Sequence, residues 1–397
     1  MEVKIQRAKA IGQISAPPSK SYAHRLLIAS ALANGKSRIE GIVSSSDMKA
    51  TINCIRALGV SLEQKDRVVS VNGGIRKGTS FDCLESGSTL RFFIPISLIF
   101  DTECTFFGTE RLMSRGLDVY FDLFKEQGIE YKLEKTSLHL KGKLRPAHFK
   151  IRGDISSQFI TGLLFALPLL DGDSTIEITT RLESEHYVDI TLEVLSRFGI
   201  EIQRKNNSFY IKGNQSYLPQ STVVEGDASN SAFLDAFNVI GGEVSVLGLN
   251  ESTIQGDYVY KFLFEQIKNS TPKIDLSSCP DLGPVCFALA SACNGATFTG
   301  VKRLRIKESD RCEAMASELR KLGCKVELFE NEAIVSGGIT PPIEPLYGHN
   351  DHRIVMALTV LCTITGGTIQ GCEAVNKSYP GFFEDIAGLG IQIEKRG

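Results

Sequence analysis

The densest group of side chains that could do chemistry lies at Arg305–Arg311, where five of seven residues carry a formal charge. The segment that follows has apolar residues at helical spacing, which predicts an amphipathic helix. The cluster would then lie at or just inside a helix N-terminus, where backbone N–H groups and the helix dipole favour anions. On a helix, Lys307 and Arg311 would share one face beside Glu308. Taken alone, a solvated helix start with ordinary ion pairs is the simpler interpretation.

Composition excludes several classes of protein. The chain has 397 residues, which suggests two or three domains, and 42% of them are hydrophobic. Its formal net charge of −2 argues against a nucleic-acid binder, so an anionic ligand must meet a local concentration of positive charge. The longest apolar run, Phe92–Phe100, is too short to span a bilayer, and the N-terminus lacks the apolar core of a signal peptide. We therefore expect a cytoplasmic protein.

The ten cysteines predict a reduced protein without a metal site. They include no CxxC pair and no zinc-finger spacing with histidine. Cys279, Cys286 and Cys293 are seven residues apart, which favours one face of a buried helix over metal binding. We interpret all ten as core residues of a cytoplasmic protein.

An internal repeat dominates the chain. An apolar helix that ends in glycine and leads into a β-type alternation recurs at Gly59, Gly128, Gly199, Gly323 and Gly390. The first three glycines are 69 and 71 residues apart and the last two are 67 apart, while a degenerate copy without glycine ends near Ile267. Glycine at a helix C-terminus followed by a strand is a stable corner, so these positions predict helix-to-strand turns.

Each unit also contains an earlier small apolar helix, a turn and a short strand. We predict six units of ~65 residues, each with two helices and about four strands, grouped as two domains of three. The boundary is expected near Val224–Asp227. A (β/α)8 barrel lacks the extra hairpin strands, and short solenoid repeats differ in length, so both alternatives are disfavoured. The fold class is α/β (α+β).

Polar residues gather at the predicted helix starts. Ser, Asp and Gly there, Ser309 and Asp310 among them, are explained by helix capping. Capping does not explain basic residues, which a positive helix end disfavours, yet they stand at or near such ends at Lys20, Arg115, Lys307, Arg311, Arg353 and Lys377. If equivalent helix ends share one side of each domain, two positive clusters would face each other across a cleft suited to phosphates and carboxylates. Asp281, Glu308 and His352 would be its acid/base groups, which indicates a transferase site for two anionic ligands.

Seven motifs in order make the chain resemble the 5-enolpyruvylshikimate-3-phosphate (EPSP) synthase family along essentially its whole length. They are Pro18–Arg25, Glu85–Arg91, Ser156–Phe159, Gly226–Ser229, Ile306–Arg311, Asn350–Arg353 and Lys377–Pro380. The resemblance implies a two-domain inside-out α/β barrel with six βαβαββ repeats, three in each domain. It places an N-terminal domain at 13–225 and a C-terminal domain at 1–12 plus 226–397. Domain closure on the first substrate would exclude water, and we expect a monomer.

The resemblance also implies a reaction in the shikimate pathway, towards chorismate and the aromatic amino acids. The 5-hydroxyl of shikimate 3-phosphate would add to C2 of phosphoenolpyruvate while C3 is protonated. Loss of phosphate from the tetrahedral intermediate would then give the enolpyruvyl ether. No metal or organic cofactor is implied, and the partners are the two small-molecule substrates rather than nucleic acid or a membrane.

The matching motifs carry over the family's site residues. Shikimate 3-phosphate would be bound by Ser21, Arg25, Ser156, Ser157, Gln158, Ser184, Tyr187, Asp281 and Lys307. Phosphoenolpyruvate would be bound by Lys20, Gly87, Arg115, Gln158, Arg311, Arg353 and Lys377. Asp281 is assigned as the base toward the 5-hydroxyl and Glu308 as the proton donor to C3. Lys20 is an alternative proton carrier, and the sequence leaves the choice between carboxylate and amine open.

A few positions depart from the family pattern or add candidate site residues. Gly116 follows Arg115 where the family usually has proline, which loosens that assignment and makes Arg111 the fallback. Arg303 is an additional candidate for a phosphate contact, as His352 is for the site. Gly87 is the small residue associated with glyphosate sensitivity.

Two alternative functions are considered. One is UDP-N-acetylglucosamine enolpyruvyl transferase, whose loop cysteine is absent between Cys104 and Cys279, and the other is a silent binding protein.

Overall fold

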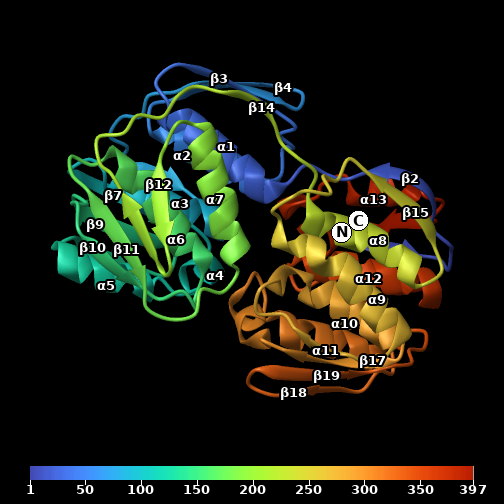
Figure 1. Cartoon of the computed structure of the whole chain (residues 1–397). Coiled ribbons are helices and arrows are strands. Elements are labelled where there is room, and N and C mark those ends of the chain that lie inside the picture. The colour runs from blue at the N-terminus through green and yellow to red at the C-terminus, as the bar shows by residue number, and fades with distance from the viewer. Residues whose placement is uncertain (397) are drawn as a thin grey trace. The chain divides into compact units, whose positions relative to one another are not determined.

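The protein was analysed as a computed structural model that describes residues 1–396, and it divides into two compact units (Figure 1). The central unit is Pro18–Glu225, and the terminal unit is Met1–Pro17 together with the chain from Gly226 onward. The first crossing lies five residues later than the expected start at residue 13. The reason is a pairing: strand β2 (Ile11–Ser15) runs parallel to β15 (Glu243–Leu247), which keeps residues 13–15 in the terminal unit.

The central unit contains three four-stranded sheets of one design. In each sheet the first two strands are parallel, and the third and fourth form an antiparallel hairpin. In spatial order the sheets are β14 (Ser221–Val223), β3 (Lys36–Glu40), β5 (Val68–Asn72) and β4 (Ser61–Lys65); β6 (Ser80–Asp82), β7 (Thr102–Phe107), β9 (Ser137–Gly142) and β8 (Glu130–Leu133); β10 (His148–Ile151), β11 (Ser174–Ile178), β13 (Ser208–Ile211) and β12 (Ile202–Lys205).

Two kinds of helix alternate with these strands. The first helix of each repeat is buried along nearly its whole length because it is apolar on most sides, and these are α1 (Lys20–Leu32), α3 (Gly87–Ser97) and α6 (Ser157–Ala166), which continues into η1 (Leu167–Leu169). The second helix buries one face only, and these are α2 (Ser46–Ala57), α5 (Asp118–Gln127) and α7 (Glu185–Arg197), with a short α4 (Glu110–Met113) before α5. Helices inside and sheets outside make the inside-out α/β arrangement.

The terminal unit repeats the design with one exception. Its buried first helices are α8 (Ala228–Val239), α10 (Gly283–Ala292) and α12 (His352–Thr365). Its other α-helices are α9 (Tyr260–Asn269), α11 (Arg311–Lys321) and α13 (Phe382–Ala387). Its 3-10 helices are η2 (Gly256–Val259), η3 (Pro280–Leu282), η4 (Val301–Ile306) and η5 (Cys372–Lys377). Two sheets have four strands: β16 (Lys273–Asp275), β17 (Gly295–Thr299), β19 (Glu332–Ser336) and β18 (Val326–Leu328); β20 (Leu346–Tyr347), β21 (Gly367–Gln370), β1 (Glu2–Ile5) and β22 (Ile393–Arg396).

The exception is the fourth repeat, for which about four strands were expected. Its sheet contains only β2 and β15 among the described residues. The degenerate copy explains the difference: α9 ends at Ser270 in extended backbone rather than at a left-handed glycine. The chain therefore passes directly into β16 of the next repeat instead of turning into a hairpin.

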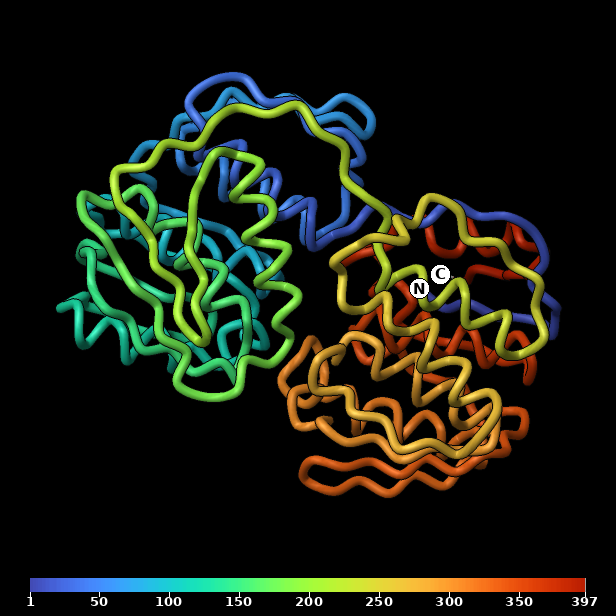
Figure 2. Tube along the Cα trace, in the orientation of Figure 1, coloured from blue at the N-terminus to red at the C-terminus, as the bar shows by residue number. Residues whose placement is uncertain are grey.

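Strands from distant parts of the chain complete individual repeats, as the trace in Figure 2 shows. In the central unit, β14 comes after the third repeat but supplies the first strand of the first sheet. In the terminal unit, β1 lies between β21 and β22, so the two ends of the chain meet in one sheet. Each unit is thereby closed on itself.

The predicted glycine corners are confirmed. Gly59, Gly128, Gly199, Gly323 and Gly390 all have positive φ, between +67° and +85°. A side chain with a Cβ is disfavoured in that left-handed region, so glycine is the residue that allows the helix to turn into the strand.

Each unit has its own hydrophobic core, and the cysteines contribute to both cores. All ten are free thiols and all but Cys293 are buried, in agreement with the expected core role. The prediction that Cys279, Cys286 and Cys293 share one helical face is wrong, because α10 contains only Cys286.

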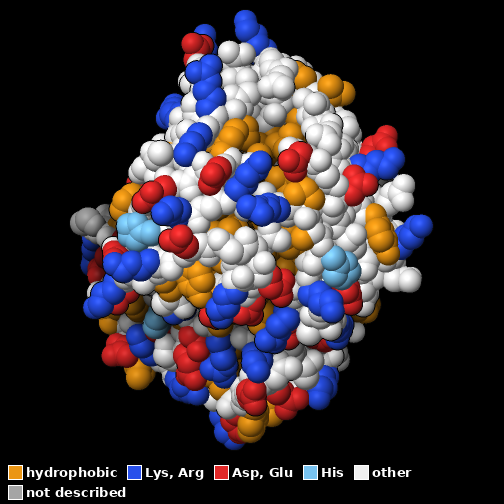
Figure 3. All heavy atoms as spheres, turned by 90° about the vertical axis from the view of Figure 1, so that its left-hand side faces the viewer, with side chains coloured by type: hydrophobic (Ala, Val, Ile, Leu, Met, Phe, Trp, Pro, Cys, Tyr) orange, Lys and Arg blue, Asp and Glu red, His pale blue; other side chains and the backbone are white. Residues whose placement is uncertain are grey.

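Over residues 1–396, no helix is both long and apolar enough to cross a bilayer. The face in Figure 3 carries interspersed acidic and basic side chains.

Candidate active site

The terminal unit gathers its charged site residues around the guanidinium group of Arg311. This side chain is 1% exposed and lies at the first position of α11. Its Nε donates to Asp351 Oδ2 at 2.9 Å, its Nη1 to Asp281 Oδ1 at 2.8 Å and its Nη2 to Glu308 Oε2 at 2.7 Å. Three carboxylates from separate segments therefore converge on one buried cation.

The charged cluster Arg305–Arg311 does not form the expected helix start. Lys307 follows η4 in extended backbone, and α11 begins only at Arg311. The two side chains therefore do not share a helix face; instead, Lys307 Nζ lies 3.3 Å from Asp281 Oδ1. Asp310 caps α11 by accepting from the N–H groups of residues 312 and 313, as predicted. Ser309, also predicted to cap, instead donates to Asp351 Oδ2 at 3.1 Å.

Asp281 is the second centre of this cluster. Besides Arg311 and Lys307, it accepts a hydrogen bond from Arg353 Nη2 at 3.0 Å. Arg353 also donates to Ser229 Oγ at 3.0 Å, which ties α12 to α8. Three cations around one carboxylate stabilise its anionic form.

Burial and charge oppose each other here. Burial lowers the pKa of Lys307 to about 8, although Asp281 acts in the other direction. Burial also opposes the charge of Arg311, but the carboxylates of Asp351, Glu308 and Asp281 outweigh it and raise the pKa of Arg311. For Asp351, burial is outweighed by Arg311, and the pKa of this carboxyl is lowered. The guanidinium group and its carboxylates thus hold one another ionised.

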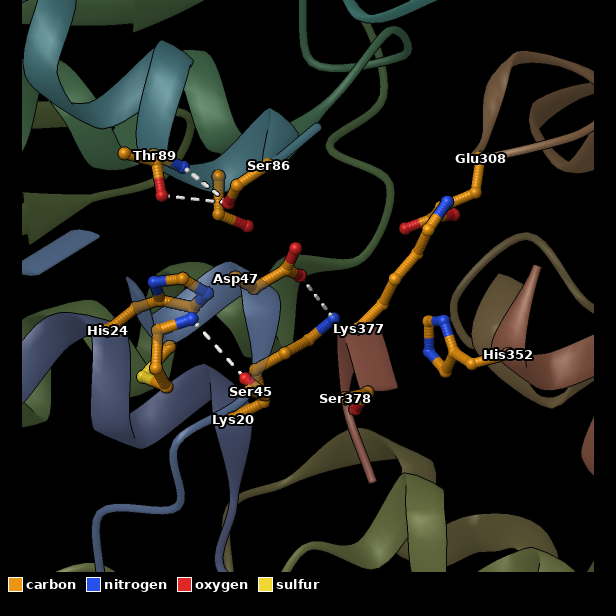
Figure 4. A network of polar contacts seen from close by, with 12 residues as sticks. Lys20, His24, Ser45, Asp47, Ser86, Thr89, Glu308, His352, Lys377 and Ser378 are labelled. Carbon is orange, nitrogen blue, oxygen red and sulfur yellow. Dashed lines mark hydrogen bonds and ion pairs between the residues drawn. The ribbon is translucent and has the colours of Figure 1, made fainter. Parts of the chain in front are cut away.

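The remaining predicted residues of this unit have different surroundings. His352 is buried at the start of α12, with Nδ1 3.9 Å from Asp351 Oδ1. Arg303 donates to the Ser277 carbonyl at 3.2 Å. Lys377 donates to the Asn350 carbonyl at 2.6 Å, from the end of η5 rather than from a helix start as expected, because α13 begins at Phe382. Figure 4 shows Glu308, His352 and Lys377 on three separate segments.

In the central unit, Lys20 lies at the first position of α1 and is held by Asp47 at the start of α2. The Nζ to Oδ2 distance is 2.9 Å, and the side chains are 16% and 14% exposed (Figure 4). The serines at the neighbouring helix starts act as caps, as predicted: Ser45, Ser86 and Ser156 accept from backbone N–H groups.

Arg25, one turn along α1, is 3% exposed. Its Nε donates to Thr191 Oγ1 at 2.8 Å, its Nη1 to the Ser21 carbonyl at 2.8 Å and its Nη2 to the Tyr187 carbonyl at 2.9 Å. Burial lowers its pKa to about 10. Ser184 precedes α7 with φ +54°, buried, and makes no capping bond to that helix.

A third group joins the starts of α3 and α6. Gln158 accepts from Arg91 Nη1 and donates to Ser88 Oγ, both at 2.8 Å. Arg91 Nη2 donates to the carbonyl of Arg115 at 2.9 Å. A Cβ on Gly87 would lie 2.9 Å from the Nη1 atoms of both arginines, so the absence of a side chain lets them approach. Ser157 is buried beside the cap, and the fallback residue 111 lies exposed on α4.

Some residues of these networks were missed by sequence reasoning. Asp351 lies in the Asn350–Arg353 motif and Asp47 at the start of α2, but aspartate at a helix start is explained equally well by capping. Asp351 does both: it accepts from the N–H of Arg353 and pairs with Arg311. Thr191 lies inside an amphipathic helix with no sequence signal. Over residues 1–396, no group of three His, Cys, Asp or Glu residues is placed to hold a metal ion.

Comparison with known proteins agrees with this chemistry. The family model for EPSP synthase (3-phosphoshikimate 1-carboxyvinyltransferase) matches residues 5–386. The 3-phosphoshikimate 1-carboxyvinyltransferases of Clostridium kluyveri and Clostridioides difficile are both 42% identical to this chain, over 99% of it and 98% of each relative. These matches disfavour the nucleotide-sugar enzyme as the alternative.

The fold is also found among solved structures. EPSP synthase from Acinetobacter baumannii superposes with a TM-score of 0.80 at 22% identity, covering 99% of this chain and 100% of that one. This likeness confirms the inside-out α/β fold class. With the family model and the relatives, it leads to one conclusion: the chain belongs to the EPSP synthase family.

Proposed function

We propose that this protein transfers the enolpyruvyl group of phosphoenolpyruvate to the 5-hydroxyl of shikimate 3-phosphate, with release of phosphate. The observation that supports this most is the Arg311 cluster, in which Glu308 and Asp281 are held in a strongly cationic setting. Addition and elimination need an acid and a base beside bound anions, and this cluster offers both. The family's activity, 3-phosphoshikimate 1-carboxyvinyl transfer, is the same reaction.

Substrate binding is proposed to use both units. Shikimate 3-phosphate would contact the central unit through Ser21, Arg25, Ser156, Ser157, Gln158, Ser184 and Tyr187, and the terminal unit through Asp281 and Lys307. Phosphoenolpyruvate would contact Lys20, Gly87, Arg115 and Gln158 of the central unit and Arg311, Arg353 and Lys377 of the terminal unit. Guanidinium groups suit bidentate recognition of phosphate and carboxylate. Enclosing both substrates would exclude water from the reacting atoms.

The proton chemistry follows from the contacts of Glu308. Its ion pair with Arg311 favours the carboxylate, which cannot donate a proton. When the carboxylate of phosphoenolpyruvate binds Arg311, it competes for that guanidinium group, and Glu308 can then take up a proton. We propose that this proton is delivered to C3 of the substrate.

Two groups are candidates for the base toward the 5-hydroxyl. Asp281 is the assigned base, and its three cationic neighbours hold it in the deprotonated form that a base requires. Lys20 is the alternative, but its ion pair with Asp47 favours the protonated amine. Asp281 is therefore the better candidate for accepting the proton, and Lys20 for stabilising developing negative charge.

The test is an assay of phosphate release from phosphoenolpyruvate. Release is expected with shikimate 3-phosphate and not with UDP-N-acetylglucosamine. Release only with the nucleotide sugar would overturn the substrate assignment. Release with neither, while shikimate 3-phosphate still binds in calorimetry, would support the silent binding protein instead.

Location and assembly belong to the same proposal. A monomer is proposed because each of the two units buries its own core, and a cytoplasmic location because all ten cysteines are free thiols. Sedimentation velocity at micromolar concentration should give one species near the mass of 43.5 kDa. A dimer mass would contradict the monomer.

A further inference from the structure

The central unit contains a recurring hydroxyl at the junctions between its repeats. The second helix of each repeat places one hydroxyl group between the first helix of its own repeat and the first helix of the next one. These hydroxyls belong to Thr51 on α2, Tyr120 on α5 and Thr191 on α7. All three side chains are buried.

The bonding pattern of these hydroxyls is regular on the side of their own repeat. Thr51 contacts the fifth residue of α1, His24, at 2.7 Å. Tyr120 donates to the carbonyl of the fifth residue of α3, Arg91, at 2.7 Å. Thr191 contacts the fifth residue of α6, Thr161, at 2.9 Å. The repeat thus conserves a structural position through three different chemical groups.

On the first helix of the next repeat, the bonding partner has the same position at two junctions and a different one at the third. Thr51 contacts Thr89 and Tyr120 donates to the carbonyl of Phe159, each partner being the third residue of its helix. At the remaining junction, Thr191 instead contacts Arg25, the sixth residue of α1. Only this junction hydroxyl bonds a side chain that is proposed to bind substrate.

Hydrogen-bond bookkeeping defines the role of the Thr191 hydroxyl. It donates to the Tyr187 carbonyl at 2.9 Å, so its single proton is used. It must therefore accept from Arg25 Nε, which can only donate, and from the hydroxyl of Thr161. One donor and two lone pairs are all engaged, which fixes the oxygen in place.

The same contacts fix the guanidinium group of Arg25. Its Cζ lies over the Phe92 ring, 5.3 Å from the ring centroid. The bonds to Thr191, Ser21 and Tyr187 leave from all three guanidinium nitrogens and so set its orientation. A guanidinium group has five N–H donors, and these bonds use three, leaving one on each terminal nitrogen to meet an anion.

We propose that Thr191 is a positioning residue that orients Arg25 for the phosphorylated substrate. The inference rests on the proposed function, in which Arg25 binds shikimate 3-phosphate. Without the Thr191 oxygen, the buried Nε–H would turn toward another acceptor and carry the terminal N–H groups out of position. Binding of this substrate should then weaken, while groups that act on phosphoenolpyruvate keep their arrangement.

The test compares Thr191→Val, Thr191→Ser and Thr161→Val. Val keeps the shape and removes the acceptor, so we expect the calorimetric Kd and the KM for shikimate 3-phosphate to rise roughly tenfold. We expect kcat and the KM for phosphoenolpyruvate to stay within about twofold. Thr191→Ser should restore binding because the hydroxyl returns. Thr161→Val removes a buried hydroxyl from the same junction but leaves every bond of Arg25, so its Kd should equal that of the unmodified protein.

Several outcomes would overturn the proposal. An unchanged Kd in Thr191→Val, an equal loss in Thr161→Val, or a Thr191→Ser variant as weak as Thr191→Val would each do so. Absence of shikimate 3-phosphate binding in the unmodified protein would instead refute the proposed function itself.

A measurement on the unmodified protein covers the case in which Thr191→Val does not fold. The Arg25 Nε–H should give an arginine side-chain NMR signal that exchanges slowly with solvent, because it is buried and bonded. Arg25→Lys, which has no Nε, identifies the signal by its loss. An Nε–H that exchanges as fast as those of exposed arginines would overturn the proposal.

Discussion

Arg25 of the central unit and Arg311 of the terminal unit are both nearly inaccessible, and the two have opposite surroundings. Arg25 of the central unit donates only to neutral oxygens, those of Thr191, Ser21 and Tyr187. Arg311 of the terminal unit donates to three carboxylates. Burial accordingly lowers the pKa of Arg25, whereas the carboxylates overcome burial and raise that of Arg311.

The difference indicates a division of labour. A buried guanidinium group without a carboxylate partner is unfavourable, and an anionic ligand relieves that cost. Arg25 is therefore suited to binding. Arg311 already has its counter-charges, so its main effect is to bring Glu308 and Asp281 together, which suits the chemical step.

Removing the proposed proton donor gives the largest expected effect. Glu308→Gln keeps the shape of the side chain and its contact with Arg311 but cannot deliver a proton. We expect kcat to fall by about 10²–10⁴-fold while the Kd for shikimate 3-phosphate is unchanged. Steady-state kinetics and calorimetry measure both. Glu313→Gln on the exposed side of α11 is the matched control and should keep full activity; turnover retained in Glu308→Gln would show that the carboxylate is not the donor.

The two arginines should also separate stability from binding. Arg311→Met leaves the buried carboxylate of Asp351 without its guanidinium partner, which should lower the free energy of unfolding by about 3–5 kcal/mol. Arg25→Met strands no bonded carboxylate and should lower it by about 1 kcal/mol or less, yet abolish most binding of shikimate 3-phosphate. Urea denaturation of both variants tests this contrast. Equal losses of stability would mean that the surroundings of the two arginines do not matter.

Alkaline pH should affect the terminal unit through Lys307. Its pKa of about 8 in the folded protein means that it loses its charge above that pH, whereas the unfolded chain keeps the proton up to the ordinary value of 10.5. The folded state binds fewer protons in that window, so this group makes stability rise from pH 8 to pH 10.5.

Binding should change in the opposite direction over the same window. The neutral amine attracts phosphate less, so kcat/KM for shikimate 3-phosphate should fall by up to roughly tenfold above pH 8. Lys307→Arg stays charged and should remove this fall. A pH profile identical in the variant would assign the transition to another group.

The smallest effect is expected at Gly87. In Gly87→Ala the new Cβ would lie 2.9 Å from two guanidinium nitrogens, so Arg91 and Arg115 must both move by a few tenths of an ångström. The KM for phosphoenolpyruvate should rise a few-fold, and inhibition by glyphosate, expected at millimolar concentration in the unmodified protein, should weaken. Unchanged values would place the Arg115 guanidinium outside the binding region.

Most of the fold could be predicted because local sequence patterns define each repeat. A glycine after an apolar helix requires the left-handed conformation, and Gly128 adopts it at φ +67°. The fourth repeat was less predictable because its helix lacks that glycine. The strand β14 that completes the first sheet comes more than 160 residues after that repeat's helices, and no local pattern indicates such a pairing.

The candidate site was predictable as residue types but not as a network. Lys307, Glu308 and Arg311 were identified as a charged cluster, but their expected helical arrangement was wrong. Whether the aspartate at residue 351 caps a helix or neutralises a buried guanidinium depends on tertiary packing. The role of Thr191 depends on the neighbouring helix and was invisible in sequence.

The central position of β1 in its sheet has a consequence for biosynthesis. Glu2–Ile5 is synthesised more than 360 residues before its two neighbours, Gly367–Gln370 and Ile393–Arg396. The central unit is complete once residue 225 has emerged, whereas Val3 and Ile5 can be buried only after residues 367–396 have emerged. The central unit should therefore fold before the terminal unit. Until β21 and β22 have been synthesised, β1 has no pairing partners and needs protection from aggregation.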